Sequence, residues 1–167
     1  MIRKIYMLND FLKEKFNEKI YKVSLDGGFT CPNRDGKVSK GGCIFCSENG
    51  SGDFTATKLK SIHEQIEEQI DLVSKKYKGD KYIAYFQNFT NTYAEVSYLR
   101  KIYQEALSHE KIVGLAIATR PDCLGDDVLE LLAELNKKTF LWVELGLQTV
   151  NDDVAKYFNR AYETEIY

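Results

Sequence analysis

The sequence lacks any long apolar run. No stretch approaches the roughly 18 uninterrupted apolar residues that a membrane-spanning helix needs. The first residues, MIRKIYMLNDFLKEKF, mix apolar and charged side chains, so they do not have the apolar centre of a signal peptide. We therefore expect a soluble, cytoplasmic protein without a membrane partner.

Cysteine is also scarce, and low-complexity sequence is absent. The 167 residues contain four cysteines, and three of them, Cys31, Cys43 and Cys46, lie close together. Small secreted proteins spread their cysteines as a disulfide framework, so this clustering favours a reducing compartment and a metal site. With 44% hydrophobic residues the chain can bury a core, and we expect one domain over residues 1–167.

Neither sign of charge is in large excess. The net charge is −2, with 11 Lys and Arg against 7 Asp and Glu in residues 1–60 and 12 against 18 in residues 61–167. An asymmetry of this size is typical of a solvated surface. Charge alone therefore predicts no nucleic-acid-binding face.

Helix and strand patterns alternate along the chain. A first helix is expected from a cap at Asn9 or Asp10. Short apolar runs predict strands, and apolar positions repeated every three or four residues predict helices. The predicted strands are 20–25, 82–89, 112–119 and 139–150, and the predicted helices are 59–77, 95–109, 126–136 and one starting at 151–153. This order requires a parallel sheet, an α/β fold of βα units with right-handed crossovers.

Residues 27–57 show neither pattern. They are rich in glycine and contain the three clustered cysteines. An irregular segment of this length inside a compact domain is usually either functional or disordered. The cysteines favour a functional loop.

Polar side chains follow each predicted strand at its carboxyl end, the edge where parallel α/β sheets carry their chemistry. Glu144 is informative, because it lies inside the apolar run FLWVELGL and a buried carboxylate needs a partner. The candidates are Asp26; Gln87, Asn88, Thr90 and Asn91; Thr119, Arg120, Asp122 and Cys123; and Glu144 and Gln148.

Three interpretations of the cysteine loop compete. Unligated thiols are disfavoured by the close clustering. Structural zinc would use the Cys43-x-x-Cys46 pair and Cys31, with Cys123 or His63 as the fourth ligand. An iron–sulfur cluster would use three thiolates and leave one iron open for another cofactor. Spacing alone does not decide between the last two.

The residues around the cysteines resemble a known family. The stretches YKVSLDGGFTCPNRDG and GGCIFCSENGSGDF resemble the radical S-adenosylmethionine (SAM) enzymes of the YhcC-like family, which is similar to the elongator catalytic subunit in its long gap before the C-x-x-C pair. Phe45 matches the aromatic residue that radical SAM loops carry before the last cysteine. The blocks YFQNFTNTYA, ATRPDCL and ELGLQT extend the resemblance through nearly the whole chain.

This resemblance implies ligands and cofactors. Cys31, Cys43 and Cys46 would ligate three irons of a 4Fe-4S cluster, and the fourth iron would bind the amino and carboxylate groups of SAM. Cys123 and His63 would stay outside the cluster. The implied SAM contacts are Asn88 and Thr90 for the amino group, Glu144 and Gln148 for the ribose or carboxylate, and Arg120 for the carboxylate unless it pairs with Asp122.

The resemblance also implies a function. The chain would cleave SAM reductively to a 5′-deoxyadenosyl radical, with tRNA wobble-uridine modification as the substrate class and flavodoxin or ferredoxin as electron donor. The alternatives are a zinc-stabilised binding module and an inactive remnant. Family cores usually have six βα units, so four strands predict an N-terminal fragment of a partial TIM barrel. Its open sheet edge would favour a homodimer.

Overall fold

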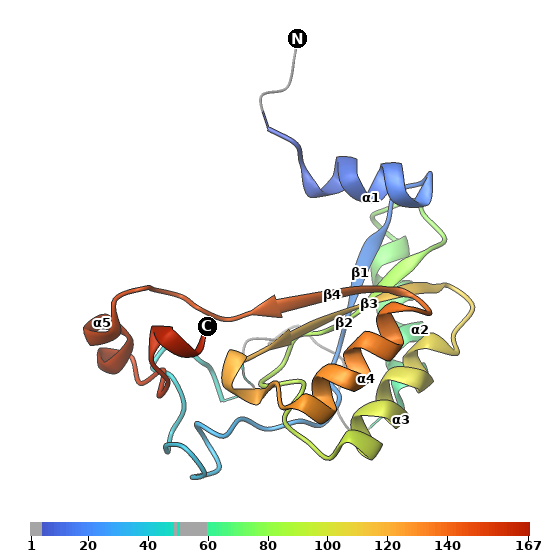
Figure 1. The fold of residues 1–167 in the computed structure, drawn as a ribbon. Helices are drawn as coiled ribbons and strands as arrows, with labels where there is room; N and C mark the ends of the chain where they lie inside the picture. Colours follow the sequence, from blue (N-terminus) through green and yellow to red (C-terminus); the bar gives the residue numbers. More distant parts are fainter. Residues whose placement is uncertain (1–4, 49, 51–59) are drawn as a thin grey trace.

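The computed structural model describes residues 5–48, 50 and 60–167. Four strands form one sheet in the order β1-β2-β3-β4, and each neighbouring pair is parallel. This arrangement confirms the predicted α/β fold, a partial barrel of βα units (Figure 1). The strands are β1 (Tyr21–Leu25), β2 (Tyr82–Phe86), β3 (Ile112–Thr119) and β4 (Phe140–Leu145).

Three helices cover one face of the sheet, as Figure 1 shows. They are α2 (Ile62–Ser74), α3 (Val96–Leu107) and α4 (Asp126–Asn136). Each places an apolar stripe against the strands, and Ile66, Leu99 and Leu131 are at most 1% exposed. Burial of these stripes is the main force that holds the helices on the sheet.

Two predicted strands are longer than the observed ones. β2 ends at Phe86 instead of residue 89, and β4 ends at Leu145 instead of residue 150. The chain turns out of the sheet soon afterwards, because Phe89 and Gln148 have positive φ angles of 60° and 62°. Both turns lie at the carboxyl edge, so they mark the place where the strands give way to a site.

Helix boundaries differ by a few residues. α1 (Leu8–Phe16) begins before the predicted cap, and the Asp10 carboxylate accepts the Met7 N–H (3.4 Å). α2 starts at a capping box in which Ser61 and Glu64 satisfy each other's main-chain N–H groups, and it ends before residue 77. Residue 59 of the predicted helix and residues 49 and 51–57 of the predicted loop lie outside the described residues.

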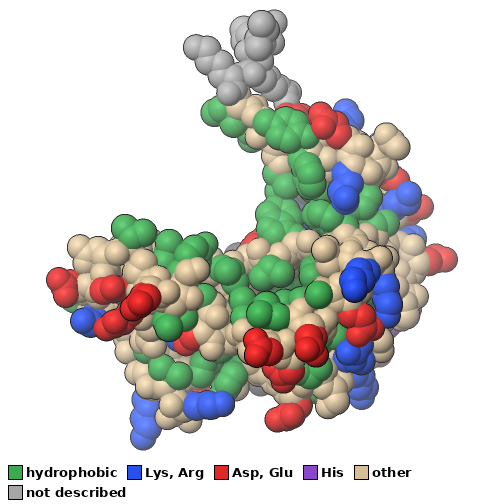
Figure 2. All heavy atoms as spheres, viewed as in Figure 1, with side chains coloured by type: hydrophobic (Ala, Val, Ile, Leu, Met, Phe, Trp, Pro, Cys, Tyr) green, Lys and Arg blue, Asp and Glu red, His purple; other side chains and the backbone are tan. Residues whose placement is uncertain are grey.

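The other face of the sheet is largely open. α1 packs across one end of it, where Leu12 joins Ile20, Ile83 and Ala116 in a small apolar cluster. Figure 2 shows hydrophobic side chains gathered in the hollow between α1 and the C-terminal segment. The outer edge of β4 pairs with no other described strand. Within the described residues, no helix has both the length and the apolar character to cross a bilayer.

The C-terminal segment lies beside the cysteine loop. After β4, the chain forms α5 (Asp152–Tyr157), and the turn that follows contacts the loop (Figure 1). The Ile44 N–H donates to the Phe158 oxygen (3.1 Å), and the Phe45 and Phe158 rings lie 5.2 Å apart. The loop is therefore held between the sheet edge and the residues after α5.

Candidate functional site

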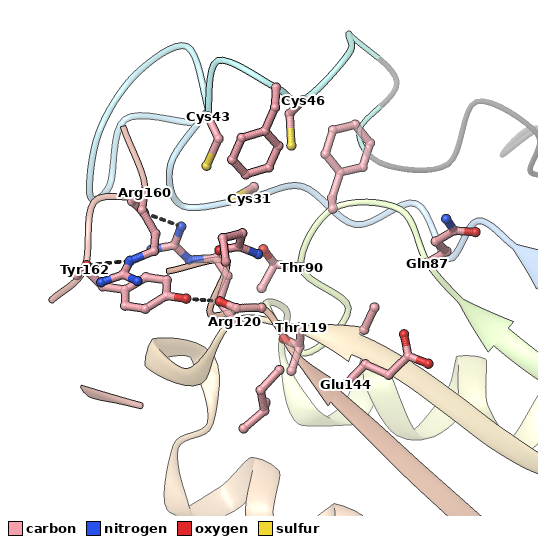
Figure 3. A pocket seen from close by; sticks show the side chains of 16 residues that line it. Cys31, Cys43, Cys46, Gln87, Thr90, Thr119, Arg120, Glu144, Arg160 and Tyr162 are labelled. Carbon is pink, nitrogen blue, oxygen red and sulfur yellow. Dashed lines mark hydrogen bonds between the residues drawn. The ribbon is translucent and has the colours of Figure 1, made fainter. Parts of the chain in front are cut away.

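A cavity of about 280 Å³ lies at the carboxyl edge of the sheet. It joins the cysteine loop to the ends of β2, β3 and β4, as Figure 3 shows. Asn88 is not among the lining residues. The residues singled out from the sequence that do line the cavity are Cys31, Cys43, Phe45, Cys46, Gln87, Thr90, Thr119, Arg120, Glu144 and Gln148.

The cysteine loop is built from tight main-chain turns. The Cys31 oxygen accepts the N–H groups of Arg34 (2.8 Å) and Asp35 (3.2 Å). The Gly42 N–H donates to the Asn33 oxygen (2.8 Å) at a φ of +77°, and a Cβ there would lie 2.8 Å from Arg34 Nε. Glycine is favoured at this point because other residues rarely adopt this positive φ.

The Cys43 and Cys46 side chains point into the same space, with Cys31 close by (Figure 3). The pKa of Cys46 is lowered to about 6, mainly by a hydrogen bond from the Cys43 thiol and also by Arg34, while burial opposes the shift. The same bond, together with burial, raises the pKa of Cys43. At neutral pH this pair therefore contains one thiolate, which is the form that binds metals.

Asn159 ties the loop to the C-terminal segment. Its main-chain oxygen accepts the Cys43 thiol (3.5 Å) and the Asn33 side-chain amide (2.5 Å). Its own amide donates to the oxygens of Lys40 (3.2 Å) and Gly42 (2.8 Å). Asn159 has a φ of 58°, a conformation that asparagine tolerates better than most residues. One residue thus fixes the main chain that carries Cys43.

Arg160 anchors the segment that follows β4. It is 1% exposed, and its guanidinium donates to the oxygens of Leu147 (2.8 Å) and Thr149 (2.6 Å) and pairs with Asp152 (2.9 Å). The Tyr162 ring lies 4.4 Å from the guanidinium carbon. A buried cation with this many acceptors is electrostatically satisfied, so it acts as a fixed wall of the cavity.

Arg120 forms an ion pair with Asp122, which is one of the two partners considered from the sequence. Its Nε and one terminal nitrogen bind the two Asp122 carboxylate oxygens at 2.8 and 2.6 Å. Its other terminal nitrogen donates to the Arg160 oxygen (2.9 Å). The bidentate pair partly neutralises the guanidinium beside the cysteines.

Glu144 has two partners on the open face of the sheet. One carboxylate oxygen lies 2.5 Å from Lys22 Nζ, and the other accepts the Tyr85 hydroxyl at 2.7 Å. The Lys22 ammonium also lies 4.0 Å from the Tyr85 ring centre and 4.2 Å from that of Trp142. The carboxylate predicted from FLWVELGL to be buried is only half-buried; its charge is compensated as expected, and it lies in the cavity wall.

Thr90 and Asn88 differ although they are two residues apart. Thr90 is 1% exposed and lines the cavity, and its Oγ1 has no hydrogen-bond partner among the described residues. Asn88 is buried behind the cavity, where its amide donates to Asp26 (3.1 Å). A buried hydroxyl without a partner is costly unless a ligand or water satisfies it.

Cys123 and His63 do not line the cavity of the three cysteines. Cys123 faces a different cavity, and burial raises the pKa of its thiol to about 12. His63 joins Glu67 and His109, whose candidate ligand atoms lie within 4.8 Å of one another. His109 Nδ1 accepts the Lys111 N–H (3.2 Å), so the neutral ring carries its proton on Nε2, facing Glu67. That tautomer opposes metal binding at Nε2.

Several residues of the site are absent from the sequence-based candidates. Asn33, Phe89, Arg160 and Tyr162 line the cavity or support it, and Asn159 orders the loop. The stretch NRAY gave no motif signal, because its contacts reach back more than a hundred residues. In the sequence, the sign of a structured turn is that the polar residues Asn159 and Arg160 follow the apolar Phe158.

Comparison with known proteins identifies the family. Residues 31–167 match the model of the Radical SAM superfamily, so the chain belongs to that superfamily. It is 51% identical over 165 residues to Bacillus subtilis YtqA, covering 99% of this chain and 51% of that protein. It is 43% identical over 164 residues to Escherichia coli YhcC, covering 98% of this chain and 52% of that protein. The predicted YhcC-like relationship is confirmed, and the chain spans about half the length of these relatives.

A solved structure supports the fold. The structure of archaeal Methanocaldococcus infernus Elp3 with an N-terminal deletion matches with a TM-score of 0.55 at 17% identity. The match covers 88% of this chain and 33% of the Elp3 chain. At this identity the likeness concerns the arrangement of strands and helices.

We predict that Cys46 is more reactive than Cys123 in the metal-free protein. At pH 7 iodoacetamide should alkylate Cys46 well before Cys123, because Cys46 is largely thiolate above pH 6 whereas Cys123 stays protonated. The Cys46 rate should fall as the pH drops through about 6. Peptide mass spectrometry measures both rates, and equal rates at pH 7 would contradict the assignment.

Proposed function

We propose that this chain is an iron–sulfur radical SAM protein that cleaves SAM reductively. Cys31, Cys43 and Cys46 would hold a 4Fe-4S cluster through three thiolates. The observation that carries the proposal is that these thiols and polar groups from β2, β3 and β4 line one cavity. Family membership supports the same chemistry.

The number of cysteines in the cavity favours a cluster over a structural zinc ion. A structural zinc site is closed by four ligands, and three cysteines line this cavity. The fourth zinc ligands considered from the sequence, Cys123 and His63, do not line it. Three thiolates and an open position are what a cluster that binds SAM requires.

When bound, the cluster supplies the electron that splits SAM into methionine and a 5′-deoxyadenosyl radical. The protein residues bind and orient the SAM molecule. The Thr90 hydroxyl, which has no partner among the described residues, would accept the SAM amino group, since Thr90 lines the cavity. Glu144 and Gln148 would accept ribose hydroxyls from the end of β4. Asn88 would act indirectly through Asp26.

Arg120 would contribute positive charge without a direct carboxylate bond. Both hydrogen-bonding edges of its guanidinium are occupied, by Asp122 on one side and by the Arg160 oxygen on the other. Its charge still faces the cavity. Attraction of the SAM carboxylate would therefore be weaker than in a bidentate contact.

The substrate and the electron donor follow from the family resemblance. We propose tRNA wobble-uridine modification as the substrate class, on the similarity of the YhcC-like family to the elongator catalytic subunit in its long gap before the C-x-x-C pair. A low-potential protein such as flavodoxin or ferredoxin would supply the electron. A cytoplasmic location fits both partners.

Cys43→Ala should abolish the broad visible absorbance of the anaerobically reconstituted protein, because one of three iron ligands is lost. Cys123→Ala is the matched control, since this thiol lies in a different cavity. Absorbance, iron content and sulfide content measure the outcome. Equal loss in both variants would overturn the choice of ligands.

SAM should perturb the electron paramagnetic resonance spectrum of the reduced cluster, at high SAM concentration. Thr90→Val should weaken this response up to about tenfold, because one hydrogen bond contributes about 0.5–1.5 kcal/mol. Glu144→Gln should weaken it as well. Thr139→Val, before β4 at the opposite end of the sheet, is the control and should respond as wild type. If Glu144→Gln lowers only the melting temperature, Glu144 has a structural role alone.

The open edge of β4 should make the 167-residue chain self-associate. The outer edge of this strand pairs with no other strand in the described part of the chain, its apolar side chains are half-buried, and such edges tend to pair. We expect a homodimer by light scattering. Trp142→Lys, which places charge on this strand, should favour the monomer. A monodisperse wild-type monomer across micromolar concentrations would refute the pairing.

A further inference from the structure

Asn33 lies directly behind Cys43 and is completely buried, with 0% exposure. Its side-chain nitrogen donates to the Asn159 main-chain oxygen (2.5 Å) and to the Cys43 sulfur (3.5 Å). A main-chain oxygen only accepts hydrogen bonds, so the nitrogen, not the oxygen, of this amide must face Asn159 and Cys43. The two hydrogens of the NH₂ group match the two acceptors.

We propose that Asn33 is a positioning residue that donates an N–H···S hydrogen bond to the metal-bound Cys43 sulfur and raises the reduction potential of the cluster. This inference rests on the proposed iron–sulfur function. It adds a residue through which the protein sets the reduction potential of the cluster. One electron arrives from a low-potential protein donor. No bond is broken and no proton is taken up.

Metal binding makes the Asn33 contact more important. In the metal-free chain, the single proton of the Cys43 thiol has two acceptors in reach, the Cys46 sulfur and the Asn159 oxygen (3.5 Å). A ligating sulfur has lost this proton, so the Asn159 oxygen keeps the hydrogen bond from Asn33, and Asn33 remains as a donor to the sulfur. Reduction adds negative charge to the iron and its sulfurs, and a donor at the sulfur stabilises that form.

Burial distinguishes Asn33 from the other donor near the thiols. Arg34 also interacts with the Cys46 sulfur, but it is only half-buried, and its guanidinium donates to the main-chain oxygens of Glu48 and Cys46 (both 3.2 Å). Solvent and salt screen a charge in that position. The Asn33 amide lies in a water-poor environment, where a hydrogen bond acts more strongly on the sulfur.

The test compares Asn33→Leu, of similar size but without N–H groups, with Asn159→Gly. The glycine control keeps the Asn159 oxygen and its left-handed backbone but removes the side-chain bonds to the loop. In a redox titration of the reconstituted protein, Asn33→Leu should shift the ratio of reduced to oxidised cluster about tenfold, about 59 mV lower for one electron. Asn159→Gly should stay near the wild-type potential. An unchanged potential in Asn33→Leu, or an equal fall in both variants, would overturn the inference.

A second measurement does not depend on the cluster. Co²⁺ added to the metal-free protein should bind the Cys43 and Cys46 thiolates, whose sulfurs are already in contact. Asn33→Leu, or Asn33→Ala if leucine prevents folding, should move the sulfur-to-cobalt charge-transfer band to lower energy, because the sulfur becomes easier to oxidise. If the variant shifts the band but the wild-type chain assembles no iron–sulfur cluster, the proposed function is refuted and the hydrogen bond is supported. Unchanged bands beside an assembled cluster would refute the hydrogen bond alone.

Discussion

The common direction of the four strands is the constraint on which the rest depends. Because β1 to β4 are all parallel, their carboxyl ends meet at one edge, and the polar residues after each strand become neighbours. The cysteine loop leaves from the same edge after β1. A single antiparallel strand would send its polar residues to the opposite end and divide the cavity.

This constraint explains how much the sequence could predict. β3 and α4 have the predicted bounds, because an apolar run between turn residues and a periodic helix are local signals. The cavity was predictable for the same reason, since Thr90, Arg120 and Glu144 follow or end strands whose direction the element order imposes. The predicted strand ends at residues 89 and 150 are wrong because the apolar residues after each strand were counted as part of it. The chain instead turns at Phe89 and Gln148, where φ is positive.

Long-range partners could not be predicted from local pattern. The sequence required a partner for Glu144, but Lys22 is 122 residues away and became that partner through packing of β1 and β4 on the open face. The Asn33–Asn159 contact spans 126 residues. Arg120 had two possible partners, the SAM carboxylate and Asp122. In the structure, the carboxylate of the nearby Asp122 pairs with the guanidinium. Which of several compatible partners is used depends on three-dimensional distances that the sequence does not display.

The separation between Cys43 and Asn159 has a consequence for biosynthesis. Asn159 orders the main chain around Cys43, yet it follows 116 residues later. At translation rates of about 5–20 residues per second, the cysteines emerge from the ribosome about 6–23 s before the residue that fixes them. Throughout that interval the thiols are open to oxidants and to stray metal ions. If the loop holds the proposed cluster, its delivery would follow synthesis of this domain, and thiol reductants would protect the nascent chain until then.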